Sequence, residues 1–232
     1  MKKSDSQENR IFKRAIVIFI IAFIIAVAGD ITQKNSDGFF SSFSIKEATL
    51  ENGRELILVN SDYSVPDDFE VDLITLSNGE QIDREAYEYL QDMFDDMRAE
   101  GYYPLVVSGY RSEEEQEEIF ESRYASYRQD GYSKKEAKSL TESWVAEPGT
   151  SEHQLGLAAD INPDREKSSD EVYEWLEDNS YKYGFIKRYP ADKTEITGIS
   201  NEPWHYRFVG EEAAEEMYKM NLCLEEYIEY IS

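Results

Sequence analysis

The spacing of apolar and polar residues along the chain predicts short strands interleaved with amphipathic helices. Residues 56–59 form an apolar run that ends at a polar turn, which is typical of a buried strand. Residues 83–100 place apolar side chains at helical spacing, with Asp83 as the N-cap and Gly101 as the stop. Further strands are expected at 105–107, 156–161, 185–186 and 206–209, and further helices at 113–128, 129–144, 172–179 and 211–230. Because regular βαβ spacing is absent, the pattern predicts a single compact α+β domain at 56–232, with a small, mostly antiparallel sheet flanked by helices.

The N-terminal residues carry the pattern of a membrane-targeting segment. Five basic residues lie within the first fourteen positions, and residues 15–29 contain no charged side chain. Positive charge ahead of an apolar stretch retains the N-terminus in the cytoplasm and directs the following chain outward. Residues 1–29 are therefore expected to be a basic cytoplasmic stub with either a signal anchor or a cleaved signal peptide. Residues 30–55 are polar without a sustained period and are expected to be a linker, which places the domain outside the cytoplasm.

Composition and charge exclude several classes of function. The chain of 232 residues holds 24 Lys and Arg against 49 Asp and Glu, a formal net charge of −25, which would repel phosphate backbones. Nucleic acid is therefore not an expected partner, and the N-terminal segment is the only expected membrane contact. A single cysteine excludes an intramolecular disulfide and a cysteine-rich metal cluster. A hydrophobic content of 41% excludes global disorder, and a monomer is the expected state.

The two histidines of the chain lie among residues that suit a catalytic metal. A catalytic zinc takes three nitrogen or carboxylate ligands and keeps one position open, and His153, Asp160 and His205 would supply that set. Glu202 lies three residues before His205, where its carboxylate could act as a general base beside the metal. This combination predicts metal-assisted hydrolysis of an amide bond.

The same residues resemble the VanY-type D-alanyl-D-alanine carboxypeptidases, which are zinc enzymes related to the VanX dipeptidases. The resemblance extends from about Leu56 to Gly210 and includes the segment Ser108-Gly109-Tyr110-Arg111-Ser112. Its central motifs are Ser151-x-His153-x-x-Gly156-x-Ala158-x-Asp160 and Glu202-Pro203-Trp204-His205.

The resemblance implies a role for each matched position. His153, Asp160 and His205 would be the ligands of a Zn²⁺ cofactor, and Glu202 the catalytic base. Arg111 would stabilise the developing oxyanion or bind a substrate carboxylate. The alternative for this arginine is a salt bridge to the acidic helix that follows it. Ser151 and Gln116 are weaker candidates for substrate contacts.

The function that follows from the resemblance is a bacterial D,D-carboxypeptidase, which removes the terminal D-alanine from peptidoglycan stem pentapeptides. Its partners would be these peptides, and its place the outer face of the cell membrane or the cell wall. An L,D-carboxypeptidase acting on tetrapeptide stems is the second reading, and an endopeptidase acting on cross-links is the third. A domain that only binds wall peptides is the non-catalytic alternative, and it would not need Glu202 beside the metal.

Overall fold

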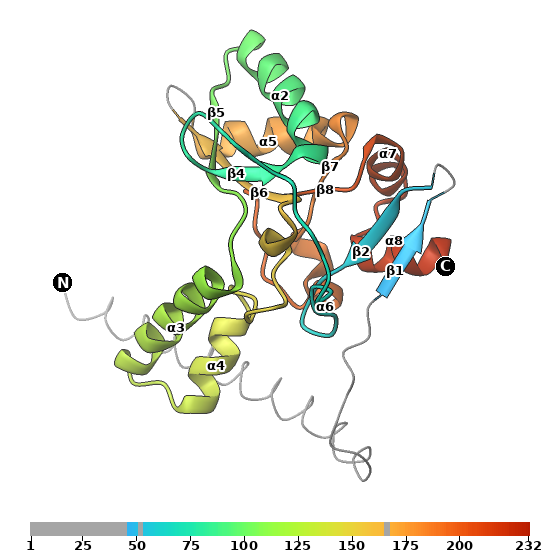
Figure 1. The fold of residues 1–232 in the computed structure, drawn as a ribbon. Helices are drawn as coiled ribbons and strands as arrows, with labels where there is room; N and C mark the ends of the chain where they lie inside the picture. Colours follow the sequence, from blue (N-terminus) through green and yellow to red (C-terminus); the bar gives the residue numbers. More distant parts are fainter. Residues whose placement is uncertain (1–45, 51–52, 165–167) are drawn as a thin grey trace, which may run out of the picture. The chain divides into compact units, whose positions relative to one another are not determined.

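A four-stranded antiparallel sheet forms the centre of the computed structural model, which describes residues 46–50, 53–164 and 168–232 (Figure 1). The order of its strands is β5 (Pro104–Ser108), β6 (Ala158–Pro163), β8 (His205–Phe208) and β7 (Phe185–Lys187). Two further sheets have two antiparallel strands each: β1 (Lys46–Thr49) with β2 (Glu55–Leu58), and β3 (Leu73–Thr75) with β4 (Gln81–Asp83). The small antiparallel sheet expected from the sequence is confirmed.

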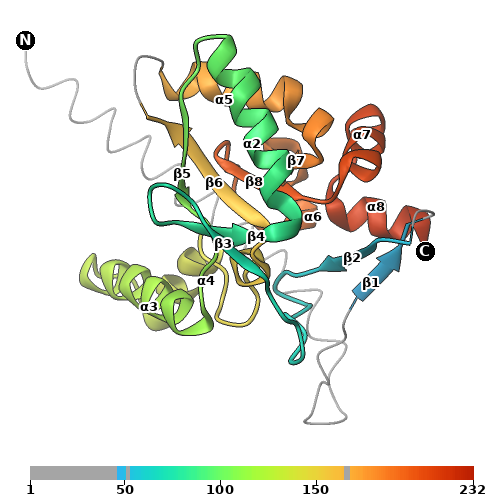
Figure 2. The same ribbon diagram turned by 45° about the horizontal axis from the view of Figure 1, so that its top comes forward.

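Helices α2 (Arg84–Ala99) and α5 (Ser169–Asn179) cover the central sheet (Figure 2). Their apolar faces share one core with the sheet, in which Leu90 and Leu176 contribute to a cluster that also holds Phe208. The Asp83 side chain accepts a hydrogen bond from the second backbone N–H of α2, as expected for an N-cap. The helix predicted at 83–100 therefore forms with almost the predicted bounds.

A second core joins both ends of the described chain. Strands β1 and β2 pack on helices α7 (Glu211–Met220) and α8 (Leu224–Ile231). The single helix predicted at 211–230 is wrong, because Asn221 adopts a left-handed conformation (φ 53) that ends α7. The linker predicted at 30–55 is also too long, since Lys46–Thr49 and the start of β2 belong to a sheet.

Helices α3 (Glu113–Gln129) and α4 (Lys134–Glu142) form a hairpin beside the sheet (Figure 1). Each begins with a capping box, in which a serine and the glutamate three residues later exchange hydrogen bonds. The helix predicted at 129–144 is shorter because Gly131 turns the chain with φ 94 before the Ser133 cap. The remaining short turns and helices are η2 (Glu152–Leu155), η3 (Ser180–Tyr183), η4 (Ala191–Lys193) and α6 (Thr194–Thr197).

The membrane-targeting segment predicted at residues 1–29 lies outside the described residues. Within the ranges that the structure describes, no helix combines the length and the apolar character needed to cross a bilayer. The signal anchor and the cleaved signal peptide both stay predictions.

Candidate active site

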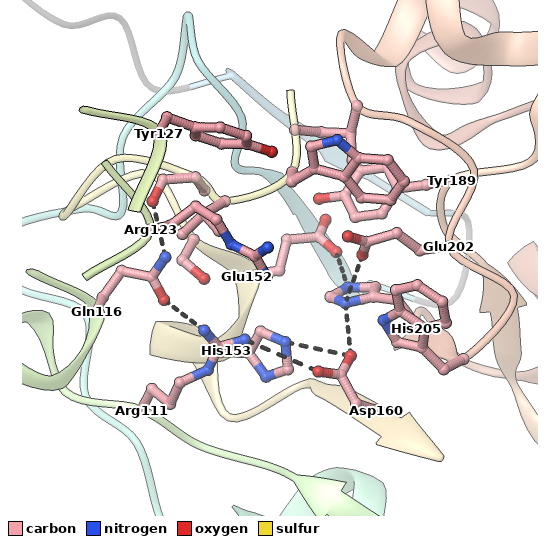
Figure 3. A pocket seen from close by; sticks show the side chains of 16 residues that line it. Arg111, Gln116, Arg123, Tyr127, Glu152, His153, Asp160, Tyr189, Glu202 and His205 are labelled. Carbon is pink, nitrogen blue, oxygen red and sulfur yellow. Dashed lines mark hydrogen bonds and ion pairs between the residues drawn. The ribbon is translucent and has the colours of Figure 1, made fainter. Parts of the chain in front are cut away.

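The three predicted metal ligands converge at one end of the central sheet (Figure 3). Asp160 on β6 and His205 on β8 are direct partners in the antiparallel register, and His153 comes from η2 just before β6. One ligand atom from each residue lies within 4.8 Å of the other two. Asp160 Oδ1 is 3.5 Å from His153 Nε2 and 3.0 Å from His205 Nδ1. The structure therefore brings together the ligand set that the sequence predicted.

Gly156 lets the chain turn from His153 into β6. It ends η2 in the left-handed region (φ 68), where a side chain is rarely accommodated. A Cβ there would also lie 3.2 Å from the backbone nitrogen of Asp83, which donates a hydrogen bond to the Gly156 carbonyl. This turn is how two ligands that are seven residues apart reach one point.

The hydrogen bonds of His153 leave one ring nitrogen for a metal. His153 Nδ1 lies 2.7 Å from the carbonyl oxygen of Gly109, and because a carbonyl only accepts, this nitrogen carries the proton. Nε2 therefore carries a lone pair. This nitrogen is buried and has no hydrogen-bond partner among the described residues. Buried polar atoms are normally paired, so a cation bound at Nε2 would complete this arrangement. A His–Asp–His donor set fits zinc.

His205 faces the ligand group through Nδ1 and a buried carboxylate through Nε2. The distance from Nε2 to Glu152 Oε2 is 3.4 Å. Burial opposes a charge on the ring, but the hydrogen bonds to Asp160 and Glu152 outweigh it and raise the pKa of His205 to about 9. Burial likewise opposes ionisation of Asp160, yet the neighbouring His153 holds the pKa of this carboxyl well below its usual range. A cation would therefore displace a proton from this group when it binds.

Glu202 lies beside the ligand group without being part of it. Its carboxylate is 3.8 Å from His205 Nδ1, on the loop that enters β8, and the residue is only 8% exposed. Burial and the nearby Asp160 raise the pKa of Glu202 to about 7, against the lowering effect of His205. A carboxyl that exchanges its proton near neutral pH suits a general base, which is the predicted role.

Arg111 points into the site from the loop between β5 and α3. Its Nη1 donates to Gln116 Oε1 at 2.8 Å, and its Nη2 lies 4.0 Å from Asp160 Oδ2. Its buried Nε has no hydrogen-bond partner within the described part of the chain. Among those residues Arg111 forms no ion pair with an acidic side chain of α3, although Glu115 attracts it at longer range. The guanidinium lies instead beside the metal ligands, where it can meet a substrate.

Gln116 and Ser151 both lie at the site. Gln116 is buried, and while its Oε1 accepts from Arg111, its Nε2 donates to the Ala146 carbonyl at 2.7 Å. It therefore positions Arg111, and its direct contact with a substrate stays a prediction. The Ser151 side chain makes no capping hydrogen bond with η2 and lines the cavity, and its contact with a substrate stays a prediction.

The ligand group lies in a cavity of about 550 Å³, a volume within the range of small-molecule sites. Helix α3 forms one wall, from which Arg123 and Tyr127 face the metal ligands (Figure 3). These two residues were not predicted from the sequence. Their spacing of four on one helix, at the end of an acidic run, was the available signal.

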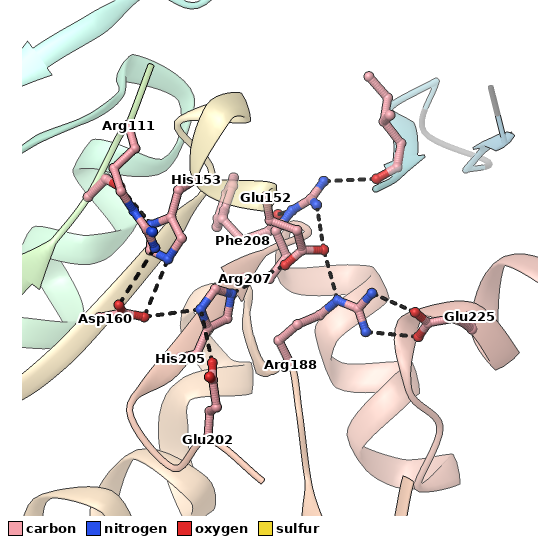
Figure 4. Close-up of polar contacts among 12 residues, drawn as sticks. Arg111, Glu152, His153, Asp160, Arg188, Glu202, His205, Arg207, Phe208 and Glu225 are labelled. Carbon is pink, nitrogen blue, oxygen red and sulfur yellow. Dashed lines mark hydrogen bonds and ion pairs between the residues drawn. The ribbon is translucent and has the colours of Figure 1, made fainter. Parts of the chain in front are cut away.

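Three buried charged residues behind His205 were also missed. Glu152 contacts both Arg188 and Arg207, and all three are nearly inaccessible to solvent (Figure 4). The two arginines interrupt short apolar segments, and a charge within such a segment indicates a buried partner.

Comparison with known proteins identifies the family. The family model of the VanY D-alanyl-D-alanine carboxypeptidases matches residues 79–211, which is more than half of the chain. A D-alanyl-D-alanine carboxypeptidase of Enterococcus faecalis is 57% identical over 184 residues, covering 79% of this chain and 69% of that protein.

Two solved structures support the assignment. VanYB in complex with D-alanine-D-alanine has 56% sequence identity and a TM-score of 0.75, covering 76% of this chain and 98% of that chain. A variant of the vancomycin-resistance D,D-pentapeptidase VanY, with alanine in place of a glutamate, was solved in complex with Zn(II). It has 58% identity and a TM-score of 0.72, covering 74% of this chain and 97% of that chain. This chain therefore belongs to the VanY family of D-alanyl-D-alanine carboxypeptidases, as the resemblance of its motifs predicted.

Proposed function

We propose that this chain is a zinc-dependent D,D-carboxypeptidase that removes the terminal D-alanine from peptidoglycan stem pentapeptides. The observation that carries the proposal is Glu202, a buried carboxyl placed 3.8 Å from a metal ligand in a cavity that also holds Arg111. A domain that only binds peptides has no use for a base at this position. Similarity to a structure that contains D-alanine-D-alanine supports the choice of substrate.

Different residues of the site have different roles in peptide hydrolysis. Zinc at His153, Asp160 and His205 would supply a Lewis acid that polarises the scissile carbonyl and activates a water molecule. Glu202 Oε2 accepts the proton of the attacking water and then transfers it to the amine of the departing alanine. A carboxyl whose pKa lies near 7 can both accept and release that proton at neutral pH.

Arg111 supplies positive charge on the other side of the ligand group. Its unpaired Nε and its Nη2, 4.0 Å from Asp160, can donate hydrogen bonds to the oxygen that becomes negative during attack or to the terminal carboxylate of the peptide. Gln116 holds the guanidinium for either role. A side chain fixed in this way loses little freedom when the substrate binds.

We also propose that the domain acts outside the cytoplasm. The support is the basic and apolar pattern of residues 1–29. A protease is added to cells whose cell wall has been removed and whose membrane is intact. We expect it to digest the domain and to leave a cytoplasmic reporter protein intact. Protection of the domain would contradict this location.

The activity can be tested by mass spectrometry of products formed from synthetic pentapeptide and tetrapeptide stems, with and without a zinc chelator. The proposal expects the loss of one alanine from the pentapeptide, and no loss in the presence of the chelator. Loss from the tetrapeptide alone would establish the L,D-activity instead, and cleavage of a cross-linked dimer alone would establish an endopeptidase. If the protein binds zinc and cleaves none of these, the hydrolase proposal fails.

A further inference from the structure

Glu152 is a buried carboxylate that borders the cavity beside His205, and the substrate chemistry described above does not use it (Figure 4). Its Oε1 accepts hydrogen bonds from Arg188 Nε at 2.8 Å and Arg207 Nη1 at 2.9 Å. Its Oε2 faces His205 Nε2 at 3.4 Å. The two carboxylate oxygens therefore have different partners: Oε1 binds two guanidinium groups, and Oε2 faces a metal ligand.

We propose that Glu152 is a positioning residue that sets the tautomer of His205. A carboxylate accepts hydrogen bonds, so when a metal displaces one ring proton, Glu152 would keep the remaining proton on Nε2 and leave the lone pair on Nδ1, the nitrogen that faces Asp160 at 3.0 Å. His153 has the opposite arrangement, because the Gly109 carbonyl holds its proton on Nδ1. The two histidines are thus prepared for the metal through different nitrogens. This inference rests on the proposed zinc site.

The rest of the network holds the Glu152 carboxylate in place. Arg188 is gripped by Glu225 of α8, with Nη1 and Nη2 donating to its two oxygens at 2.8 and 2.6 Å. Arg207 donates from Nη2 to the Ile57 carbonyl of β2 at 3.1 Å. Two arginines and two glutamates balance in charge, so a site of low polarity can contain them.

The same geometry predicts what an amide would do at this position. In Glu152→Gln, the two guanidinium donors require an acceptor at the Oε1 position, so the amide oxygen must lie there. The amide NH₂ is then directed at His205 Nε2 and demands a lone pair from it. The ring proton moves to Nδ1, which is the nitrogen that the metal needs. The substitution is nearly isosteric, yet it inverts the tautomer.

Glu225→Gln is the matched control. It removes a carboxylate from the same network and leaves Arg188 with less compensating charge, but no hydrogen bond or ion pair joins Glu225 to His205 in the described part of the chain. Both variants are expected to lower the free energy of unfolding. Only Glu152→Gln is expected to change the metal-facing nitrogen.

The experiment is a zinc titration of the full chain, purified in detergent, against a chromogenic chelator at neutral pH. Glu152→Gln should weaken zinc binding by about 10 to 100-fold, the usual effect of losing a partner behind a ligand, and Glu225→Gln by less than about 3-fold. Unchanged affinity in Glu152→Gln, or equal losses in both variants, would overturn the proposal. Wild-type protein that binds no zinc would overturn the proposed function as well, so the two failures are distinguishable.

A second measurement needs no variant and decides the matter if Glu152→Gln does not fold. The chain has only two histidines, so ¹⁵N-histidine NMR of the zinc-loaded wild type resolves both rings. We expect one ring protonated at Nδ1 and the other at Nε2. Two rings with the same tautomer would overturn the assignment.

Discussion

Gly109 offers a sharp test of how closely the site depends on the backbone around it. It follows the last residue of β5, where its carbonyl accepts the proton of His153 Nδ1 and its N–H donates to Glu80 Oε2 at 2.9 Å. A Cβ placed on Gly109 would lie 2.0 Å from the carbonyl oxygen of Gln81. Gly109→Ala therefore creates a backbone clash directly behind a metal ligand.

The size of the effect follows from that distance. Real Cβ contacts shorter than 3.0 Å essentially do not occur, so the two backbones must separate by about 1 Å. The Gln81 carbonyl resists this movement, because it accepts a hydrogen bond from Tyr110 N at 2.6 Å. The displacement reaches both His153 and Arg111. Misplacement of catalytic groups by about 1 Å costs on the order of 100-fold in rate, or about 2.7 kcal/mol in activation free energy.

The assay is kcat/KM on a peptide substrate together with zinc affinity, and Gly79→Ala is the control. Gly79 lies in the turn between β3 and β4, with φ +97 and no atom within 4 Å of its would-be Cβ. Alanine at position 79 strains the backbone of the β3–β4 hairpin, which includes Gln81, without approaching the site. We expect Gly109→Ala to lower both readouts and Gly79→Ala to lower only the melting temperature. The reasoning is refuted if Gly109→Ala keeps wild-type kinetics and zinc affinity.

Four further predictions follow from the site and the fold. Glu202→Gln should lower kcat by about 10² to 10⁴-fold with a full equivalent of zinc retained, as elemental analysis can check; wild-type turnover would remove Glu202 as the base. Arg111→Ala should cost about 2 to 4 kcal/mol in kcat/KM with zinc retained, and unchanged kinetics would contradict its role. Zinc affinity should rise with pH until about 9, because below that pH the metal must displace the proton of His205, and a flat profile in a competition assay would speak against this linkage. Asn221→Ala should lower the free energy of unfolding by about 1 kcal/mol in urea melts while Asn221→Gly should not, since only alanine opposes the left-handed turn.

The periodic spacing of apolar residues predicted most helices and central strands, because an element buried on one face must carry apolar residues at regular intervals. The helix after Asp83 and the acidic helix before Gln129 both form nearly as predicted. The errors arose where a local conformation interrupts an otherwise continuous pattern. Asn221 breaks the last helix through a single dihedral angle, and the apolar spacing on either side of it gives no warning. The strand at Lys46–Thr49 is short and largely polar, so only its pairing with β2 reveals it.

Some residues of the candidate site could be predicted from the sequence and others could not. Metal ligands and a general base need particular chemistry, so residue types and spacing predicted His153, Asp160, His205 and Glu202, whereas Arg111 was predicted from the resemblance to the VanY family. Residues that only position these side chains need a suitable partner in the folded structure, and the sequence does not show which residues come together there.

Glu152 illustrates this limit. It lies between Ser151 and His153 in the sequence, yet its duty depends on two arginines 36 and 55 residues away. A sequence read alone shows no relation among these three charges. The arginines' position in apolar segments was the one available hint that a buried acid must exist.

The ladder between β6 and β8 has a consequence for how this enzyme can change over evolutionary time. It fixes Asp160 opposite His205 through main-chain hydrogen bonds, which do not depend on side-chain identity elsewhere. The cavity wall that carries Arg123 and Tyr127 belongs instead to helix α3, in which only Gln116 and Phe120 are buried. The strands that carry two of the three metal ligands and the helix that forms this wall are thus separate stretches of chain, linked through the contact of Gln116 with Arg111. We expect substitutions at Arg123 and Tyr127 to reshape the cavity wall while the strand pairing that holds Asp160 and His205 is inherited intact.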